Sequence, residues 1–356
     1  MVRILLIGPL PPPMGGDTRH FATLVADLTA HRDYDVRVID TSRGAGHSDW
    51  MSNALVSLRT LARIAARLKD VDVVSFHASD RGMFLFGPLV VALCKMAGKP
   101  SILRLFGGSF GDAYRSQSRV RRALTRATLL SCDVMLLQTK RAVREIQAGA
   151  RADVVWFSTY VETAVRTAGP DPRACGTEAA CCRRFVFLGH LWRTKGIETL
   201  LESAPLLPDD CTIDIFGPAD EYSPEQINER GRGKVRYGGF LTHEEVGAKL
   251  WEYDCLVLPT FHPGEGYPGV IAEAFAHELP VITTNWLAIP EIVDPESGIL
   301  IEPQNTAAFA AAVAALHDDS QRWLRLKDGA RRASLQFDHA VWARKFESIC
   351  ESLVKN

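Results

Sequence analysis

The sequence lacks the hydrophobic segments that membrane insertion requires. No apolar run reaches the length of a membrane-spanning helix, and no N-terminal segment has the charged, apolar and small-residue order of a signal peptide. The first apolar run, residues 2–7, is too short for a signal core. The formal net charge is only −1 over 356 residues. We therefore expect a cytoplasmic protein of ordinary globular composition, with no nucleic acid among its partners.

Two phosphate-binding motifs are also missing where the first predicted strand ends. The segment from Gly8 to Thr18 contains no Gly-x-Gly-x-x-Gly, the dinucleotide fingerprint of oxidoreductases, and no Gly-Lys-Ser/Thr motif for a nucleotide phosphate loop. It reads Pro-Pro-x-Gly-Gly instead and ends at Gly15 and Gly16, before a predicted helix. A tight turn with Asp17 or Thr18 as helix cap explains this pattern without a ligand.

The eight cysteines form no recognisable framework. Five stand singly in apolar or helical surroundings, where a free thiol behaves as a small hydrophobic side chain. The other three crowd positions 175, 181 and 182, but no Cys-x-x-Cys pair or matching histidine spacing accompanies them. We expect reduced, structural thiols and no metal site.

Short apolar runs typical of buried strands alternate with helical patterns along the chain. The predicted strands are 2–7, 35–40, 72–76, 100–105, 133–137, 153–156, 185–188, 212–216, 234–237, 255–258, 280–283 and 299–302. The helices expected in the first half are 17–30, 52–69, 82–98, 116–131 and 140–148. Such alternation predicts parallel α/β sheets with crossover helices.

The alternation stops between Arg166 and Arg184, where Gly, Pro and cysteine carry no periodicity. We therefore predict a first domain over 1–165, a linker region over 166–184, a second domain over 185–336 and an amphipathic terminal helix over 337–356. Ligands of open parallel sheets bind beyond the carboxyl ends of the strands, so two facing sheets would share one cleft.

Charge is distributed unevenly between the two halves. Residues 1–165 hold 22 Lys and Arg against 14 Asp and Glu, and residues 166–356 hold 19 against 28. The basic first half favours an anionic or membrane-surface partner, although oppositely charged lobes would also attract each other.

The strongest functional signal lies between the predicted strands 255–258 and 280–283. It is a turn rich in glycine and proline, followed by an Ala-rich helix, and it contains Glu265 and Glu273. A helix N-terminus offers unpaired N–H groups to a phosphate, and glycine lets the backbone approach the anion. A carboxylate accepts hydrogen bonds in pairs and so suits a sugar diol. Together these features indicate a nucleotide-sugar site.

Residues 265 to 274 resemble the donor motif of the retaining glycosyltransferases of family 4, Glu-Gly-(aromatic)-(Gly/Pro)-x-x-x-x-Glu-Ala. The resemblance implies the GT-B fold: two facing Rossmann-like domains with a cleft between them, and a C-terminal helix that crosses back to the first. It implies that Glu273 binds the donor ribose and that Glu265 faces the transferred sugar. It also implies that the amides of Gly269 and Val270 hold the distal phosphate. Gly266, Tyr267 and Pro268 complete the motif.

Further donor residues follow from the same resemblance. The segment Gly189-His190-Leu-Trp-Arg193-Thr-Lys195-Gly is similar to the family's Gly-Arg-Leu-x-x-x-Lys-Gly. Lys195 falls on the lysine that pairs with donor phosphates, His190 stands where the family has arginine, and Arg193 is a candidate to supply the missing guanidinium. The strand ends at Gly217, Phe240 and Leu241 match segments that line the base and ribose pocket. Gly15 and Gly16 match the first loop, which approaches donor phosphate and acceptor.

The acceptor side departs from the family pattern. Many relatives carry a sugar-contacting histidine where Phe106 or Gly107 stands here, which puts that role in doubt. Arg104 and Ser109 are candidate replacements. His77, at the end of another strand, is either a satisfied structural group or a contact to acceptor or sugar.

Basic residues recur on two predicted helices of the first half. A helix over Tyr114 to Arg126 would place Arg115, Arg119 and Arg122 on one face, and positions 59, 63 and 67 form a second arginine stripe. These are either solvated faces or a surface for anionic lipid head groups or a lipid-phosphate acceptor. A peripheral location at the inner face of the membrane is compatible with the second interpretation.

The sequence therefore predicts a retaining hexosyltransferase-type enzyme, as implied by the family resemblance. It would move a sugar from a UDP- or GDP-sugar to a hydroxyl of a glycan or lipid-linked acceptor, in polysaccharide or glycoconjugate biosynthesis. Lys195, Arg193 and the helix N-terminus at Gly269 would stabilise the diphosphate leaving group, so we expect no metal and no cofactor. Two alternatives stay open: a non-catalytic nucleotide-sugar-binding subunit, and a sugar-nucleotide epimerase of the same fold.

Overall fold

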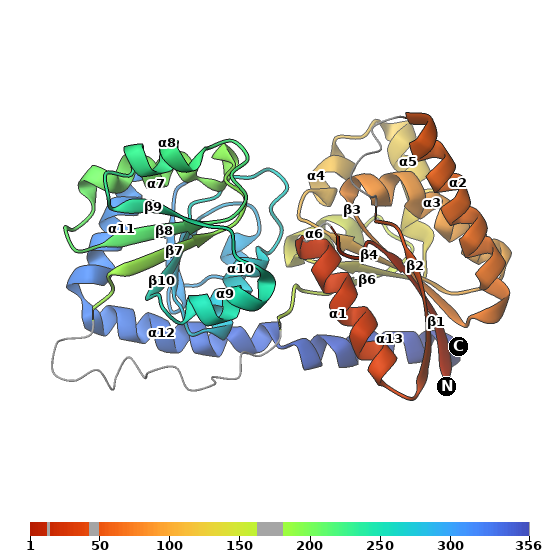
Figure 1. Cartoon of the computed structure of the whole chain (residues 1–356). Helices are drawn as coiled ribbons and strands as arrows, with labels where there is room; N and C mark the ends of the chain where they lie inside the picture. The colour runs from red at the N-terminus through yellow and green to blue at the C-terminus, as the bar shows by residue number, and fades with distance from the viewer. Residues whose placement is uncertain (13–14, 43–49, 162–180, 356) are drawn as a thin grey trace. The chain divides into compact units, whose positions relative to one another are not determined.

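The computed structural model describes residues 1–12, 15–42, 50–161 and 181–355. These residues form two compact units, each built on a six-stranded parallel sheet with flanking helices (Figure 1). The first unit comprises residues 1–159 and 340–356, and the second comprises residues 160–339. In the described part of the chain, no helix is both long and apolar enough to cross a membrane.

The sheet of the first unit has the strand order β2-β1-β3-β4-β5-β6. Its strands are β1 (Val2–Gly8), β2 (Tyr34–Asp40), β3 (Val73–Ser79), β4 (Ser101–Phe106), β5 (Val134–Leu137) and β6 (Asp153–Trp156). Its helices are α1 (Gly16–Ala30), α2 (Trp50–Arg67), α3 (Asp80–Met96), α4 (Phe110–Arg115), α5 (Arg119–Ala127), α6 (Lys140–Gln147) and α13 (His339–Lys355).

The sheet of the second unit has the order β12-β11-β10-β7-β8-β9. Its strands are β7 (Arg184–Leu188), β8 (Thr212–Phe216), β9 (Val235–Gly239), β10 (Cys255–Leu258), β11 (Val281–Thr284) and β12 (Gly298–Ile301). Its helices are α7 (Ile197–Ser203), α8 (Pro224–Arg230), α9 (His243–Leu250), α10 (Gly269–Ala276), α11 (Thr306–Asp318) and α12 (Ser320–Ser334).

Each predicted strand is present, and most are short apolar runs buried in their sheet, whereas the edge strands β2 and β9 are partly exposed. The helix predicted over 116–131 is present in shorter form as α5, but the continuous helix predicted from Tyr114 to Arg126 is wrong. Ser118 has non-helical backbone angles and caps a new helix, its Oγ accepting from the Arg121 amide at 3.4 Å. The chain therefore forms α4 and then α5, and Arg115 does not share a helix face with Arg119. Arg115 instead pairs with Glu145 at 2.6 Å.

Alternation along the strands divides the interior of the first unit into two cores. Leu5, Phe76 and Leu103 belong to a core that includes buried side chains of α2 and α3. The intervening positions, such as His77, contact the other layer: the His77 ring lies 4.9 Å from that of Phe21 on α1 and 6.1 Å from that of Phe346 on α13. The helix α13 is therefore part of the interior of the first unit.

The predicted linker region lies outside the described residues from 166 to 180, and its final residue, Arg184, begins β7. The chain passes from the first unit to the second at Thr159/Tyr160 and returns at His339/Ala340. The two connections lie side by side, because the Val161 amide donates to the Phe337 carbonyl at 3.0 Å and the His339 amide donates to the Val161 carbonyl at 3.2 Å. The second unit is thus inserted into the first.

Replacement of Phe346 by alanine tests the contribution of α13. Phe346 is fully buried and its ring lies 6.2 Å from that of Phe157. Phe346→Ala should lower the free energy of unfolding by about 3–5 kcal/mol, because it opens a cavity in the first unit. Val341, which is 46% exposed on the same helix, supplies the control. Equal urea midpoints for Phe346→Ala and Val341→Ala would contradict this packing.

Two buried histidines should make the first unit sensitive to acid. Burial and the charge of Arg104 hold the pKa values of His20 and His77 well below the usual 6.5. The unfolded chain therefore binds protons that the folded chain does not, so stability is complete above pH 6.5 and is lost as the pH falls below it. Below pH 6.5 the free energy of unfolding should fall by about 2.7 kcal/mol per pH unit for the two histidines together. Urea unfolding at several pH values should give half this slope for His77→Gln, and an unchanged slope would refute the assignment.

Candidate functional site

The candidate donor residues of the second unit gather at a change of strand order. From β7 the sheet continues through β8 to β9 on one side, whereas β10 pairs with β7 on the other. Because all strands are parallel, the loops after β7 and β10 leave the same edge and flank the crevice between them. In open α/β sheets this switch point is where ligands bind. Lys195 lies in the loop after β7, and Glu265 lies in the loop after β10.

Lys195 and Glu265 form an ion pair across this crevice. The Lys195 Nζ lies 3.0 Å from Oε1 and 2.7 Å from Oε2 of Glu265. The Thr260 hydroxyl donates to the same Oε2 at 2.8 Å. The side chains of Lys195 and Glu265 are only 16% and 8% exposed, so the pair is poorly screened by solvent. The crevice therefore holds a fixed ammonium and a fixed carboxylate in contact.

The two loops that carry this pair are packed directly on each other. Gly196 has a φ of 89°, and a Cβ at this position would lie 2.2 Å from the Pro259 carbonyl oxygen. The Phe261 amide donates to the Thr194 carbonyl at 2.7 Å. Only glycine allows both the left-handed backbone and this approach. Gly196 thereby fixes the residue before it, Lys195, over the loop that carries Glu265.

A wall of aromatic rings borders the loop after β7. The His190 ring stacks on Trp192 with centroids 4.5 Å apart, and its Nδ1 lies 2.7 Å from Asp220 Oδ2. Trp192 lies 5.4 Å from the ring of His262. Burial and the charge of Lys195 lower the pKa of His262, although the charge of Glu265 acts in the opposite direction. His190 is therefore held by Asp220 and Trp192 at the rim.

The α10 N-terminus presents unpaired amides. Pro268 occupies the N-cap and supplies no side-chain hydrogen bond, and the first backbone bond of the turn is from Ile271 to the Pro268 carbonyl at 3.0 Å. Neither the Gly269 amide nor the Val270 amide donates to another described residue. A Cβ at Gly269 would meet no atom within 4 Å, so the space beside it is open. These two amides are suited to an anion.

The remaining motif residues form the support of this turn. Gly266 and Tyr267 are buried, and the Tyr267 hydroxyl donates to Glu291 Oε2 at 2.7 Å. Glu273 lies one turn further along α10 and is half-buried. It faces the same helix side as Gly269, four residues earlier, because residues i and i+4 share a face. A carboxylate therefore stands one turn from the open amides.

Glycines hold the ends of β7, β8 and β9 close together. The Gly189 amide donates to the Phe216 carbonyl at 3.1 Å, and the Gly217 amide donates to Gly239 at 3.0 Å. A Cβ on Gly217 would lie 1.9 Å from the Gly189 carbonyl oxygen. Beyond β9, Phe240 is 63% exposed and Leu241 is half-buried. These strand ends leave backbone groups and one exposed ring beside the crevice.

Arg193 is directed differently from Lys195. Its amide donates to Glu221 Oε2 at 2.6 Å and its side chain is exposed. The pKa of Glu198 is lowered mainly by its hydrogen bond with Arg230 and also by the charge of Arg193. Burial raises the pKa of Tyr222, and the charge of Arg193 opposes that rise. The charge of Arg193 therefore acts on Glu198 of α7 and on Tyr222.

The candidate acceptor residues of the first unit lie near its own switch point, between β1 and β3. Gly15 caps α1, its amide bonded to Thr18 Oγ1 at 2.9 Å, whereas residues 13 and 14 of the Pro-Pro-x-Gly-Gly motif lie outside the described residues. Gly16 begins α1. His77 is fully buried: Nε2 lies 2.8 Å from Ser75 Oγ, and Nδ1 has no hydrogen-bond partner among the described residues.

Arg104 and Ser109 are also engaged within the first unit. Arg104 is 2% exposed, with its guanidinium 4.8 Å from the centroid of Phe106 and 4.6 Å from that of Phe157. Ser109 Oγ donates to Asp80, whose pKa is raised by burial although this bond opposes the rise. Both side chains are thus held by the first unit's own residues.

A mainly apolar pocket of ≈ 450 Å³ opens at this switch point. Phe76, Ala78 and Ile64 line its apolar wall, and Asp17 and Arg81 line its polar side. His77 also borders it. Sequence reasoning found His77 and Gly15 but not the pocket, because its walls come from α2 and α3, far along the chain. It also missed Thr260 as the partner of Glu265.

One group of potential metal ligands lies away from these residues. Asp210, Cys211 and His317 bring ligand atoms within 4.8 Å of one another. His317 is already paired with Asp210 at 2.9 Å, and Arg183 lies 2.8 Å from the same carboxylate. Burial raises the pKa of the Cys211 thiol to about 12, which disfavours the thiolate that a metal requires. The group fits a surface ion-pair network better than a metal centre.

Comparison with known proteins identifies the second unit. Residues 182–319, which include the Lys195–Glu265 pair and α10, match the family model described as glycosyl transferases group 1. This segment of the second unit is therefore similar to that family. The chain is 25% identical over 168 residues to the N,N'-diacetylbacillosaminyl-diphospho-undecaprenol alpha-1,3-N-acetylgalactosaminyltransferase of Campylobacter jejuni, covering 47% of this chain and 43% of that protein. It is 28% identical over 157 residues to the O-antigen chain mannosyltransferase B of Escherichia coli, covering 42% and 40%.

The chain thus spans less than half the length of these two relatives. Its whole fold is similar to that of Anabaena Alr3699/HepE, solved in complex with UDP, with a TM-score of 0.75, 17% identity and coverage of 99% and 100%. The chain has the predicted GT-B fold, with two Rossmann-like units.

Glycine replacement tests the loop packing around Lys195. Gly196→Ala should destabilise the second unit by about 3 kcal/mol or more, because the new Cβ meets the Pro259 carbonyl. Gly233 also has a positive φ, 78°, but no atom lies within 4 Å of a Cβ there. Gly233→Ala should therefore cost only about 1 kcal/mol, the backbone term alone. Thermal unfolding of both variants would reveal the difference, and equal losses would contradict the close approach.

Proposed function

We propose that this protein is a retaining glycosyltransferase of family 4 that transfers a sugar from a UDP- or GDP-sugar to a hydroxyl of a glycan or lipid-linked acceptor. The Lys195–Glu265 pair at the switch point between β7 and β10 carries the proposal, because it holds a cation against a carboxylate that lies four residues before the Gly269 amide of α10. The cation and the amides suit a diphosphate, and the carboxylate suits a sugar hydroxyl.

In this proposal each group has a distinct task. The Gly269 and Val270 amides and the Lys195 ammonium hold the diphosphate, whose negative charge grows as the bond to the sugar breaks. Glu273 accepts hydrogen bonds from the ribose hydroxyls, and Glu265 accepts them from the transferred sugar. Because Lys195 is bound to Glu265, its ammonium has a fixed position in the site. Fixed protein charges serve the leaving group, and the proposal includes no metal.

The acceptor is proposed to bind to the first unit. The pocket at the β1–β3 switch point offers an apolar wall with Asp17 and Arg81 at its polar side, which suits a glycan or lipid-linked molecule with both characters. The similarity of the chain to transferases named for an undecaprenol-linked substrate and for O-antigen chains supports polysaccharide or glycoconjugate biosynthesis. His77 and Ser109 remain candidates on this side.

Ligand-dependent thermal unfolding tests the donor site. UDP, GDP and ADP are compared on the wild type, Lys195→Met and Glu273→Gln, with Glu244→Gln, an exposed carboxylate on α9, as the charge-matched control. One diphosphate at about 100 times its dissociation constant should add about 2.7 kcal/mol, a shift of a few degrees. Glu273→Gln should abolish the shift. Lys195→Met should reduce the shift caused by the diphosphate, but should leave unchanged any shift caused by the corresponding nucleoside without phosphates, which is measured alongside.

Turnover decides between transferase, binder and epimerase. Incubation of the protein with the nucleoside diphosphate sugar of the stabilising nucleotide and a glycan or lipid-linked acceptor, followed by NMR, should show release of the nucleoside diphosphate and a glycoside with the donor's anomeric configuration. Stabilisation without turnover of any donor and acceptor pair would favour the binding subunit. An isomerised sugar nucleotide would favour the epimerase. A thermal shift that survives Glu273→Gln would show that the wrong carboxylate was assigned.

A further inference from the structure

The two carboxylate oxygens of Glu265 have unequal surroundings. Oε2 accepts two short hydrogen bonds, from the Lys195 ammonium at 2.7 Å and from the Thr260 hydroxyl at 2.8 Å. Among the described residues, Oε1 accepts only from the same ammonium, at 3.0 Å. Glu265 is 7% exposed, so its carboxylate depends on these donors more than on water. Oε2 is therefore the anchored oxygen, and Oε1 is the oxygen with unused acceptor capacity.

The Thr260 hydroxyl is oriented so that its hydrogen points at Glu265. Its Oγ1 accepts from the His262 amide at 3.2 Å, which leaves the hydroxyl hydrogen free to donate. Two acceptors compete for this hydrogen, Glu265 Oε2 at 2.8 Å and the Thr194 carbonyl at 3.3 Å. The carboxylate is nearer and charged, and a hydrogen bond to a charged acceptor is the stronger kind. The hydroxyl therefore donates to Glu265.

The backbone and the core hold Thr260 in this position. Thr260 is fully buried two residues after the end of β10, and its amide donates to the Leu258 carbonyl at 2.8 Å. Its own carbonyl accepts from the Thr284 hydroxyl on β11. A β-branched side chain also has few χ1 choices. None of these contacts involves the Lys195 side chain, so the fold itself places the hydroxyl beside Glu265.

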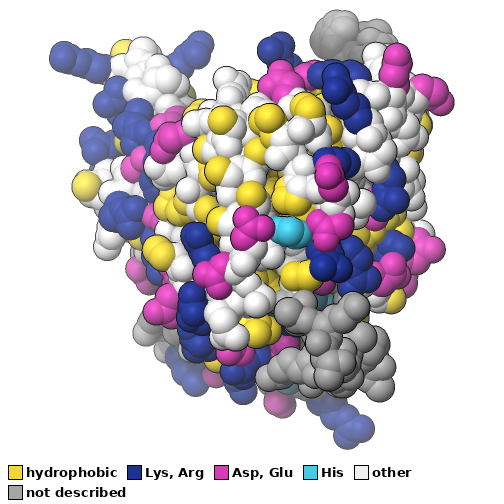
Figure 2. All heavy atoms as spheres, turned by 90° about the vertical axis from the view of Figure 1, so that its left-hand side faces the viewer, with side chains coloured by type: hydrophobic (Ala, Val, Ile, Leu, Met, Phe, Trp, Pro, Cys, Tyr) yellow, Lys and Arg dark blue, Asp and Glu magenta, His cyan; other side chains and the backbone are white. Residues whose placement is uncertain are grey.

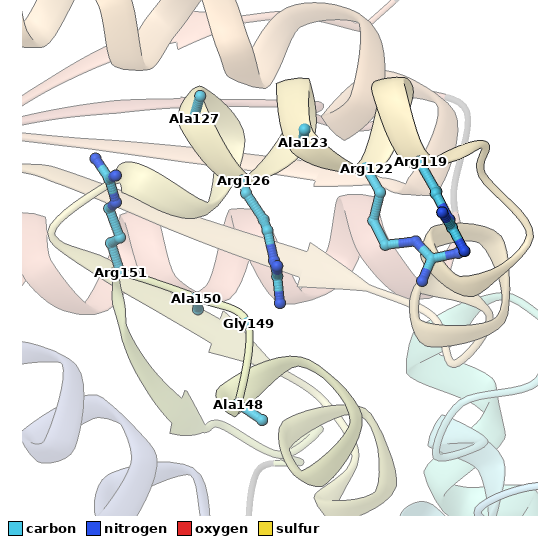
Figure 3. A pocket seen from close by; sticks show the side chains of 9 residues that line it. All are labelled: Arg119, Arg122, Ala123, Arg126, Ala127, Ala148, Gly149, Ala150 and Arg151. Atoms are coloured by element: carbon cyan, nitrogen blue, oxygen red, sulfur yellow. The ribbon is translucent and has the colours of Figure 1, made fainter.

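Lys195 differs in its surroundings from cations at the surface of the protein. Figure 2 shows one face, on which Lys and Arg lie among Asp and Glu. Figure 3 shows a hollow of ≈ 620 Å³ in the first unit, where the exposed Arg119, Arg126 and Arg151 lie. Water screens the charges at both places, so the loss of a partner has little effect there. Lys195 and Glu265 are only 16% and 8% exposed, so the loss of the ammonium would leave a poorly hydrated carboxylate.

A bound diphosphate would compete with Glu265 for the Lys195 ammonium. In the proposed function this ammonium holds the donor diphosphate, and one positive charge cannot neutralise both a diphosphate and a carboxylate. Lysine has three donors on a single nitrogen, so bonds to phosphate oxygens are made at the expense of those to Glu265. Within the described part of the chain, Thr260 is then the remaining side-chain donor that holds this carboxylate.

We propose that Thr260 is a positioning residue of the donor site. Its hydroxyl keeps Oε2 of Glu265 anchored while Lys195 binds the diphosphate, so that Oε1 remains directed at a hydroxyl of the transferred sugar. This inference rests on the proposed function and assigns a separate role to each oxygen of one carboxylate. Thr260 itself touches neither the donor nor the acceptor, and it acts through Glu265.

Substitution of Thr260 in the full chain tests this role, with Thr283 as the matched control. Thr283 is also fully buried, and its hydroxyl donates at 2.8 Å to the Leu258 carbonyl instead of Glu265. Thr260→Val and Thr283→Val make the same chemical change, and Thr260→Ser retains the hydroxyl. A panel of UDP- and GDP-sugars is first screened on the wild type by calorimetry and by turnover with a glycan or lipid-linked acceptor. The nucleotide sugar that binds is then used for all variants.

Thr260→Val should weaken binding of the nucleotide sugar and lower kcat/KM by about tenfold to a hundredfold, because a hydrogen bond to a charged group is lost. Thr260→Ser should restore both values to within about threefold of wild type, and Thr283→Val should stay within about twofold. Binding of the nucleoside diphosphate alone should be unchanged in all three variants, because it has no sugar to contact Glu265. Melting temperatures verify that each variant is folded.

A double variant shows whether Thr260 acts through Glu265. The dissociation constant of the nucleotide sugar should be the same for Glu265→Ala and for Thr260→Val/Glu265→Ala, because the hydroxyl has no carboxylate to hold in either. A further loss of affinity in the double variant would overturn the inference.

Three other results would also decide against Thr260. If wild type binds a nucleotide sugar and Thr260→Val behaves like Thr283→Val, the inference fails and the proposed function stands. If Thr260→Ser is as impaired as Thr260→Val, or if the diphosphate alone is weakened as much as the nucleotide sugar, Thr260 serves only the packing of its loop. A wild type that binds none of the nucleotide sugars would overturn the proposed function, and the role of Thr260 with it.

Discussion

The parallel direction of every strand is the constraint on which both candidate sites depend. In each sheet the strand order reverses at one point, between β1 and β3 in one unit and between β7 and β10 in the other. The loops that follow the two strands at this point run in opposite directions and leave a crevice between them. Side chains that are 70 residues apart in sequence, Lys195 and Glu265, meet because their loops leave the same edge. The pocket of the first unit arises in the same way, so one topological rule places donor and acceptor candidates.

The nearly buried ion pair explains why the loops around it are so closely joined. Removing an ammonium and a carboxylate from water is costly, and the cost is recovered only when the geometry is fixed and the remaining oxygens are hydrogen-bonded. Thr260 supplies that bond, and Gly196 permits the contact between the loops. These contacts fix the ammonium and the carboxylate relative to each other.

The strands and the donor motif could be predicted because both are local features of the sequence. A buried strand is a short apolar run, and the turn before α10 carries its glycines and glutamates within a few residues. The contacts that complete the sites could not be predicted in this way. Lys195 was found through its motif, but nothing in the neighbourhood of Thr260 distinguishes it from other strand-end residues or shows that both side chains bind Glu265. The break at Ser118 was missed because serine is tolerated within helices and marks a cap only when the backbone turns there.

The insertion of the second unit into the first also governs the order in which the protein can fold during synthesis. Residues 160–339 emerge from the ribosome as one uninterrupted stretch, so the second unit has all its strands before translation ends. The first unit cannot be completed until residues 340–356 have also been made. Its layer around His77 remains open until α13 is made, because Phe346 and its neighbours come from the far side of the insertion. The strands that precede the insertion are therefore completed by a helix that follows it, and a ribosome-bound chain can hold a finished second unit while the first is still incomplete.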